Sequence, residues 1–140
     1  MRICIDSCIF VHGLRESDRA SVRLLDMLNE NVMLVIPRLI AQEVTRNLMT
    51  REQVQRFYRL FQSRDFASIV DEPAPDEFVA KYVNLGLRAK ADAYIGAFAE
   101  WMQVRCLISD NRHFLQELRT DAFEVLDAAA FIARWESGAL

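Results

Sequence analysis

The sequence predicts a three-layer α/β fold in which a central parallel sheet of four to five strands is flanked by helices. Short apolar runs alternate with amphipathic stretches along the chain, as they do where strands alternate with helices. Helix-length segments separate the strand-like runs, and such crossovers join parallel strands. A chain of 140 residues, 52% of them hydrophobic, is also the size of a single domain, residues 1–140, with a substantial core.

Residues 2–37 predict two strands with a helix between them. The run RICIDSCIF, residues 2–10, opens with a strand that ends near Asp6. Residues 17–30 follow a helical pattern, with Ser17 as a candidate N-cap. The run VMLVI, residues 32–36, predicts a second buried strand that Pro37 stops.

Helices are predicted through most of the middle of the chain. Pro37 suits the entrance of a helix that reaches about residue 50, and residues 51–63 continue as another helix. The aromatic residues of this second helix either belong to the core, which their spacing favours, or stack on bases; they are Phe57, Tyr58 and Phe61. The run FASIV, residues 66–70, indicates a short strand. The breaker DEPAPDEF then precedes a short helix within residues 75–87.

The last third of the chain predicts two more strands among three helices. Alanine-rich residues 89–102 predict a helix, and residues 105–109 a strand. Residues 111–118 predict a short helix and residues 123–126 a strand. The chain closes with a helix to residue 136 whose N-cap is Asp127.

Composition and charge narrow the class of protein. A net charge of −3 does not indicate a nucleic-acid binder. Arginines nevertheless recur through the middle of the chain, where they either contact phosphate or form a solvated helix face: Arg38, Arg46, Arg51, Arg56, Arg59 and Arg64. Three cysteines without a C-x-x-C pair support neither a disulfide framework nor a thiolate zinc site. No membrane span or secretory signal is recognisable, so we expect a cytoplasmic protein.

Two acids follow predicted strands. Asp6 ends the first strand and Asp110 ends the strand at residues 105–109, so both face the carboxyl edge of the sheet. Ligands of parallel α/β sheets bind at this edge. The local alternative for each residue is that its carboxylate caps the helix that follows.

Glu43 lies on a predicted helix, at the margin of the face that packs against the sheet. It comes three residues after Ile40 and directly before Val44. A carboxylate in this position is partly removed from water. The alternative is an ion pair on the helix surface with Arg38 or Arg46.

Asp92 has a similar position on the alanine-rich helix. It shares a face with Ile95, Gly96 and Ala99, and the small residues of this face permit close approach to the sheet. The alternative is an acid that interacts with the helix dipole.

Considered together, the four acids predict a metal site. Carboxylates that lie close together repel one another and raise one another's pKa, which destabilises the fold unless a cation lies among them. Oxygen ligands without histidine or thiolate select hard cations, so we expect Mg2+ or Mn2+.

Four segments of the chain resemble the PIN-domain family, and within it the VapC-type toxin ribonucleases of bacterial toxin–antitoxin pairs. They occur in the family's order and spacing over nearly the whole chain: CIDSCIF, LIAQEVTRNL, KADAYIGAFAE and LISDNRHFL. The resemblance implies a PIN-like fold and a Mg2+- or Mn2+-dependent endoribonuclease whose acidic quartet is Asp6, Glu43, Asp92 and Asp110. It also implies an RNA substrate, a homodimer, and an antitoxin that covers the acidic cleft and commonly inserts a basic side chain there.

The last segment departs from the family pattern, which reads Thr or Ser, any residue, then Asp or Asn. Ser109 therefore aligns with the hydroxyl residue and Asn111 with the usual ligand position. Either Asp110 or Asn111 completes the metal ligands with Asp6 and Asp92, and the number of ions stays open. The residues assigned to substrate binding are Ser7, for which a turn role is the alternative, Ser109 and Arg112.

The predicted reaction is metal-dependent hydrolysis of an RNA phosphodiester, in which the ion activates a water and neutralises developing charge. Glu43 is either a ligand or the base that positions the nucleophile. His12 and His113 are interpreted as structural rather than catalytic residues. The alternatives are an inactive PIN-like module that binds RNA or protein, an RNA-processing nuclease outside toxin–antitoxin systems, and a phosphoaspartyl enzyme. The absence of any lysine after Lys90 counts against the last.

Overall fold

A five-stranded, fully parallel sheet forms the centre of the molecule. The computed structural model describes residues 1–62, 65–87 and 90–140. The strand order is β3-β2-β1-β4-β5, and neighbouring strands are parallel throughout, which confirms the predicted sheet. The strands are β1 (Arg2–Ile5), β2 (Met33–Pro37), β3 (Ala67–Val70), β4 (Cys106–Ile108) and β5 (Glu124–Leu126). Cys4 pairs with Leu107 in the middle of the sheet, and both are fully buried.

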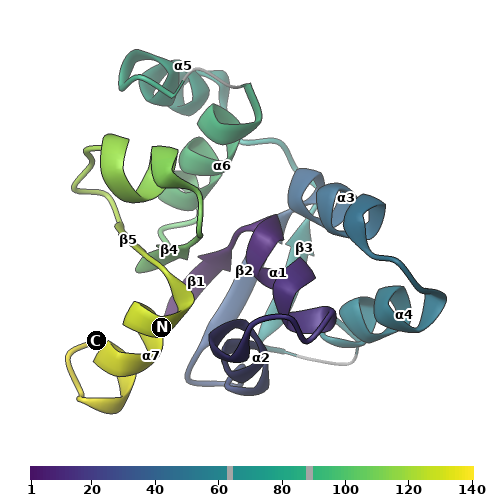
Figure 1. Cartoon of the computed structure of the whole chain (residues 1–140). Helices are drawn as coiled ribbons and strands as arrows, with labels where there is room; N and C mark the ends of the chain where they lie inside the picture. The colour runs from purple at the N-terminus through teal and green to yellow at the C-terminus, as the bar shows by residue number, and fades with distance from the viewer. Residues whose placement is uncertain (63–64, 88–89) are drawn as a thin grey trace.

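Helices flank this sheet, as the sequence predicts (Figure 1). They are α1 (Ser7–Leu14), α2 (Arg19–Asp26), α3 (Arg38–Asn47), α4 (Arg51–Arg59), α5 (Asp76–Asn84), α6 (Lys90–Trp101) and α7 (Ala128–Glu136), with a π-helical turn, η1 (His113–Glu117). Helix α1 packs against α2, and α5 packs against α6. The predicted helix start at Ala89, the predicted end at Ser63, and Arg64 lie outside the described residues. No helix in the described ranges is long and apolar enough to cross a membrane.

Helix α1 is absent from the sequence-based prediction. The strand does end before Asp6, as predicted, but the apolar run continues as a helix because the Asp6 carboxylate accepts a hydrogen bond from the Ser7 N–H and caps it. Five of the eight residues of α1 are buried. A short helix buried on most sides has the same continuous apolar pattern as a buried strand, so the pattern does not distinguish them.

Two helix starts also differ from the prediction. Helix α2 is capped by Asp18 rather than Ser17, because the Asp18 carboxylate accepts hydrogen bonds from both the backbone N–H and the hydroxyl of Ser21. The predicted helix 111–118 is reduced to the π-helical turn η1.

The close approach expected between Gly96 and the sheet is instead an approach to Tyr82 on α5. The predicted core role of Phe57 is confirmed, since the residue is fully buried.

An ion-pair cluster ties β5 to its neighbours. Glu124 on β5 pairs with Arg105, at 2.5 Å, and with Arg134 on α7. Hydrogen bonds from Arg134 and Arg105 lower the pKa of Glu124 to about 2. The cluster therefore stabilises the fold fully above the ordinary glutamate pKa of 4.5, and its contribution is lost as the pH falls from there toward about 2.

Glu124→Gln is expected to lower the free energy of unfolding at pH 7 by about 0.5–1 kcal/mol. The effect is limited because 38% of the Glu124 side chain is exposed to solvent. Urea unfolding measured from pH 7 down to pH 2 should show the difference between variant and wild type shrinking with falling pH. Glu72→Gln, at an exposed position, is the matched control. A difference that is constant over this pH range would contradict the ionic origin of the effect.

Candidate active site

One pocket at the carboxyl edge of the sheet brings together all four predicted acids. Its volume is about 270 Å3, and its walls are formed by Asp6, Ser7, Cys8, Glu43, Asp92, Ile95, Asp110 and Asn111. The acids come from four different parts of the chain: the end of β1, helix α3, the first turn of α6 and the segment after β4. We call this cavity the acid pocket.

Asp6 is the most buried acid of the pocket, with 5% of its surface exposed. Its two carboxylate oxygens accept hydrogen bonds from the Ser7 N–H, at 2.8 Å, and from the hydroxyl of Ser109, at 2.6 Å. Burial raises the pKa of Asp6; the bonds from Ser109 and Ser7 oppose the rise, and the charges of Glu43 and Asp92 add to it. Ionised Asp6 therefore lies in a negative field that destabilises it.

Glu43 is half-buried on α3 and is bound to the start of α1. The hydroxyl of Ser7 donates a hydrogen bond to Glu43 Oε2 at 2.8 Å. Neither arginine considered as an alternative partner pairs with Glu43 in the described ranges. Arg38 binds Asp71, with 2.7 Å between Nε and Oδ1, and Arg46 donates to the carbonyl of Gln42. The side chain of Glu43 therefore belongs to the pocket rather than to the outer helix surface.

Asp92 lies in the first turn of α6 and faces Asn111. The amide nitrogen of Asn111 lies 3.4 Å from Asp92 Oδ1, and Asn111 Oδ1 accepts a hydrogen bond from the His113 N–H at 2.9 Å. The second bond fixes the orientation of the amide, because a flipped amide would direct its NH2 group at another N–H donor. In this arrangement Asn111 donates to Asp92.

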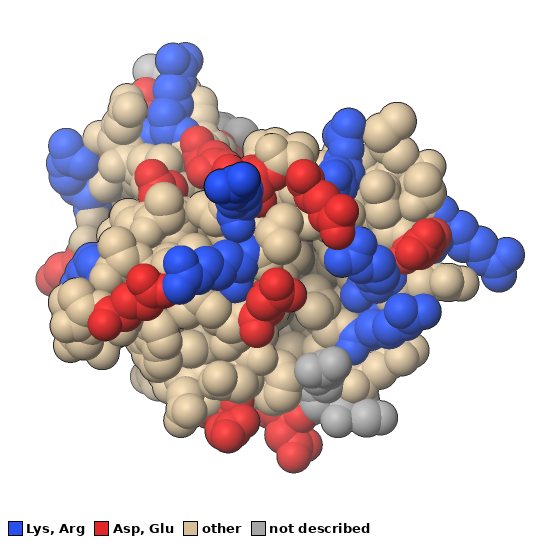
Figure 2. Space-filling model, turned by 60° about the horizontal axis from the view of Figure 1, so that its bottom comes forward, with Lys and Arg blue, Asp and Glu red and all other residues tan. Residues whose placement is uncertain are grey.

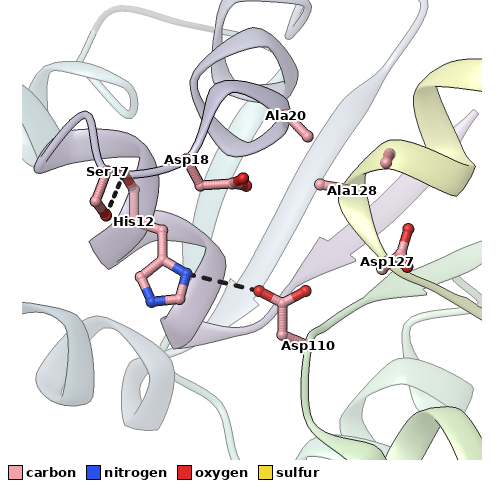
Figure 3. A pocket seen from close by; sticks show the side chains of 8 residues that line it. His12, Ser17, Asp18, Ala20, Asp110, Asp127 and Ala128 are labelled. Carbon is pink, nitrogen blue, oxygen red and sulfur yellow. Dashed lines mark hydrogen bonds and ion pairs between the residues drawn. The ribbon is translucent and has the colours of Figure 1, made fainter.

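Asp110 lies at the boundary between the acid pocket and a larger cavity (Figure 3). His12 Nδ1 is 3.6 Å from Asp110 Oδ2. The larger cavity, which we call the outer groove, measures about 540 Å3 and is lined by His12, Ser17, Asp18, Ala20, Asp110, Asp127, Ala128 and Ala129. Asp110 contributes to the walls of both cavities.

The donor atoms of the acid pocket fit a hard divalent cation. The carboxylate, hydroxyl and amide oxygens of its walls are ligands that such cations prefer, and burial and the charge of Asp6 raise the pKa of the Cys8 thiol to about 11. Where the structure describes the chain, no three His, Cys, Asp or Glu side chains are grouped closely enough to enclose a metal ion. The carboxylates of Asp6, Glu43 and Asp92 would have to turn toward one another to do so.

Three contacts of the acids are not predicted by the sequence. The hydroxyls of Ser7 and Ser109, both predicted to bind substrate, donate to Glu43 and Asp6 in the structure. His12 lies beside Asp110. Arg112 is exposed and does not line the acid pocket. Over the face shown in Figure 2, basic side chains lie among acidic ones rather than in one continuous patch.

The fold is that of a PIN-type domain, and the PIN domain family matches residues 3–133. The chain therefore belongs to the PIN domain family. Its fold is similar to that of VapBC2 from Rickettsia felis, bound to a DNA fragment from its promoter, with a TM-score of 0.65 and 17% identity over 89% of this chain and 97% of that one. It is also similar to VapBC-1 from nontypeable Haemophilus influenzae, with a TM-score of 0.64 and 18% identity over 92% and 99% of the respective chains. No curated protein matches.

Proposed function

We propose that this protein is a Mg2+- or Mn2+-dependent endoribonuclease and the toxin of a toxin–antitoxin pair. The observation that carries the proposal is the convergence of Asp6, Glu43 and Asp92 on one pocket at the carboxyl edge of the sheet. Burying one of these carboxylates beside the other two costs free energy that a bound cation would offset. Nuclease chemistry is also the activity expected of the PIN domain family.

Each carboxylate has a defined part in the proposed reaction. Asp6, Glu43 and Asp92 would hold the cation, which when bound supplies an acidified water and positive charge opposite the scissile phosphate. Ser109 donates a hydrogen bond to Asp6 and Ser7 donates one to Glu43, so both serines orient the carboxylates before a cation binds. Glu43, which is less buried than Asp6, would be either a ligand of the cation or the base that accepts a proton from the attacking water.

The toxin role is supported by the similarity of this fold to two VapBC structures. A partner antitoxin would cover the acid pocket and direct a basic side chain at its carboxylates, since the pocket has a negative field and an arginine fork matches carboxylate geometry. We further propose a homodimer that acts in the cytoplasm, where its RNA substrate is found.

Metal binding is tested first by thermal melting. Adding Mn2+ or Mg2+ at millimolar concentrations is expected to raise the melting temperature of the wild type, because the ion binds the folded state alone. Asp92→Asn should remove most of this response. Asp26→Asn, at an exposed position at the end of α2, is the matched control and should keep it. A wild type with no metal response would remove the basis of the proposal.

Cleavage of a mixed RNA pool then tests catalysis. The wild type is expected to cleave RNA in Mn2+, and to stop when the ion is removed with EDTA or when Asp92 is replaced by Asn. RNA binding without cleavage would instead identify a binding module. If the protein cleaves RNA but no protein encoded next to it inhibits the cleavage, the nuclease lies outside toxin–antitoxin systems.

A further inference from the structure

The position of Asp110 suggests a role different from that of the other acids. It forms the wall shared by the acid pocket, of about 270 Å3, and the outer groove, of about 540 Å3. Ligand pockets for small molecules measure roughly 300–1,000 Å3. The acid pocket therefore suits a phosphate and an ion, and the remainder of a nucleotide must extend beyond it. A nucleotide that extends from the acid pocket into the outer groove would lie next to Asp110.

His12 lies beside the Asp110 carboxylate at this boundary, with 3.6 Å between Nδ1 and Oδ2. The two side chains come from the last turn of α1 and the segment after β4, and they point toward each other in the outer groove (Figure 3). The exposed fractions of the two side chains are 45% and 43%, so a substrate can reach both. Asp6, by contrast, is almost fully buried.

The chemistry of the outer groove excludes a second phosphate. Of the residues that line it, three are aspartates and none is lysine or arginine. A phosphate would be repelled there, whereas a group that donates a hydrogen bond would be accepted. Because Asp110 lines both cavities, the sugar attached to a phosphate held in the acid pocket would lie beside this wall. In RNA that sugar carries a 2′-hydroxyl, which is a hydrogen-bond donor that DNA lacks.

We propose that Asp110 accepts a hydrogen bond from the ribose 2′-hydroxyl beside the scissile phosphate, and that His12 is the positioning residue that holds it there. Asp110 then determines that the substrate is RNA rather than DNA, and it is not a metal ligand. This inference rests on the proposed nuclease function. It leaves the acid pocket with the carboxylates of Asp6, Glu43 and Asp92 as the ligands.

The test pairs Asp110→Ala with an RNA that lacks one 2′-hydroxyl. The cleavage site is first mapped on an all-RNA oligonucleotide, and single 2′-deoxy substitutions are then made on either side of it and at a distant control position. For the wild type, one deoxy substitution next to the site should lower kcat/KM by about 10- to 100-fold, as expected for a hydrogen bond to a charged group. For Asp110→Ala, cleavage of RNA should fall by a similar factor, and the same deoxy substitution should have no further effect.

The Mn2+ response separates this role from metal binding. The Mn2+ concentration that gives half of the maximal melting shift should change less than about twofold in Asp110→Ala. A rise of about tenfold or more would make Asp110 a metal ligand and overturn the inference. If the losses of kcat/KM from Asp110→Ala and from the deoxy substitution multiplied, the inference would also be overturned, but the proposed nuclease function would stand. No cleavage by the wild type at all would end the proposed function as well. Asp110→Asn removes the charge but keeps an acceptor oxygen, so it should lose less RNA cleavage than Asp110→Ala, and Asp26→Ala is the control.

The positioning role of His12 has its own readout. His12→Ala should weaken the discrimination between RNA and the deoxy-substituted oligonucleotide without changing the Mn2+ response. His12→Asn should restore discrimination, because its amide N–H can take the place of the Nδ1–H of the ring. Equal discrimination in wild type and His12→Ala would show that His12 has no such role.

Discussion

Asp6→Asn is expected to abolish RNA cleavage and, in the absence of metal, to make the protein more stable. Asp6 is buried next to the charges of Glu43 and Asp92, so its ionised form destabilises the metal-free fold. Asparagine removes that charge and remains a good N-cap for α1. Its amide can also bond Ser109. We expect the melting temperature to rise by several degrees, which corresponds to about 1 kcal/mol or more.

The pH dependence of this effect follows from the direction of the pKa shift. The folded-state pKa of Asp6 lies above its ordinary value of 3.8. Protonated Asp6 therefore stabilises the fold below pH 3.8, and this stabilisation is lost as the pH rises through the folded-state pKa. The stability advantage of Asp6→Asn should be smallest in acid and largest near neutral pH.

Both parts of this prediction can be measured on the same samples. Thermal melting in EDTA should give a higher midpoint for Asp6→Asn than for the wild type, and titration with Mn2+ should then reverse the order, because only the wild type gains stability from the ion. Cleavage should fall by at least about 100-fold. Asp26→Asn is again the matched control. If Asp6→Asn melts at a lower temperature than the wild type in EDTA, the Asp6 carboxylate stabilises the metal-free fold and the prediction is wrong.

The acid pocket was largely predictable because its acids follow simple geometric rules. Asp6 and Asp110 follow strands, and parallel strands direct their carboxyl ends to the same edge. Glu43 and Asp92 could be placed by counting along helices, since helical faces repeat at known intervals. Each rule depends on residues near in sequence and on the parallel sheet, which the order of elements predicts.

The contacts that orient these acids could not be predicted in the same way. The hydrogen bond from Ser7 to Glu43 spans 36 positions of the sequence, and the one from Ser109 to Asp6 spans 103. Serine hydroxyls occur in turns, caps and sites alike, so their pattern does not identify a partner. The pair of His12 with Asp110 depends on α1, a helix that the apolar pattern of residues 7–14 concealed. Long-range polar contacts depend on packing that local periodicity does not describe.

Gly96 shows the same limit in the hydrophobic core. Its position one helical turn after Asp92 suggested that a small residue lets α6 approach the sheet. The structure instead places the ring of Tyr82, on α5, where a Cβ at position 96 would be 2.7 Å from Cδ1. Tyr82 is fully buried, and its ring stacks on Phe123 with 6.0 Å between centroids. The ring therefore has little freedom to move away.

Gly96→Ala is accordingly expected to lower the free energy of unfolding by about 1–3 kcal/mol, although alanine is the better helix former by about 1 kcal/mol. Gly13→Ala is the matched control. Gly13 is also a buried helical glycine. Its added Cβ would be 2.7 Å from the terminal Cδ1 of Leu25, which can turn away more easily than an aromatic ring, and 3.1 Å from the backbone oxygen of Ser21. Urea unfolding of both variants should therefore give a clearly larger loss for Gly96→Ala. Equal losses would mean that the Tyr82 ring yields as readily as the neighbours of Gly13.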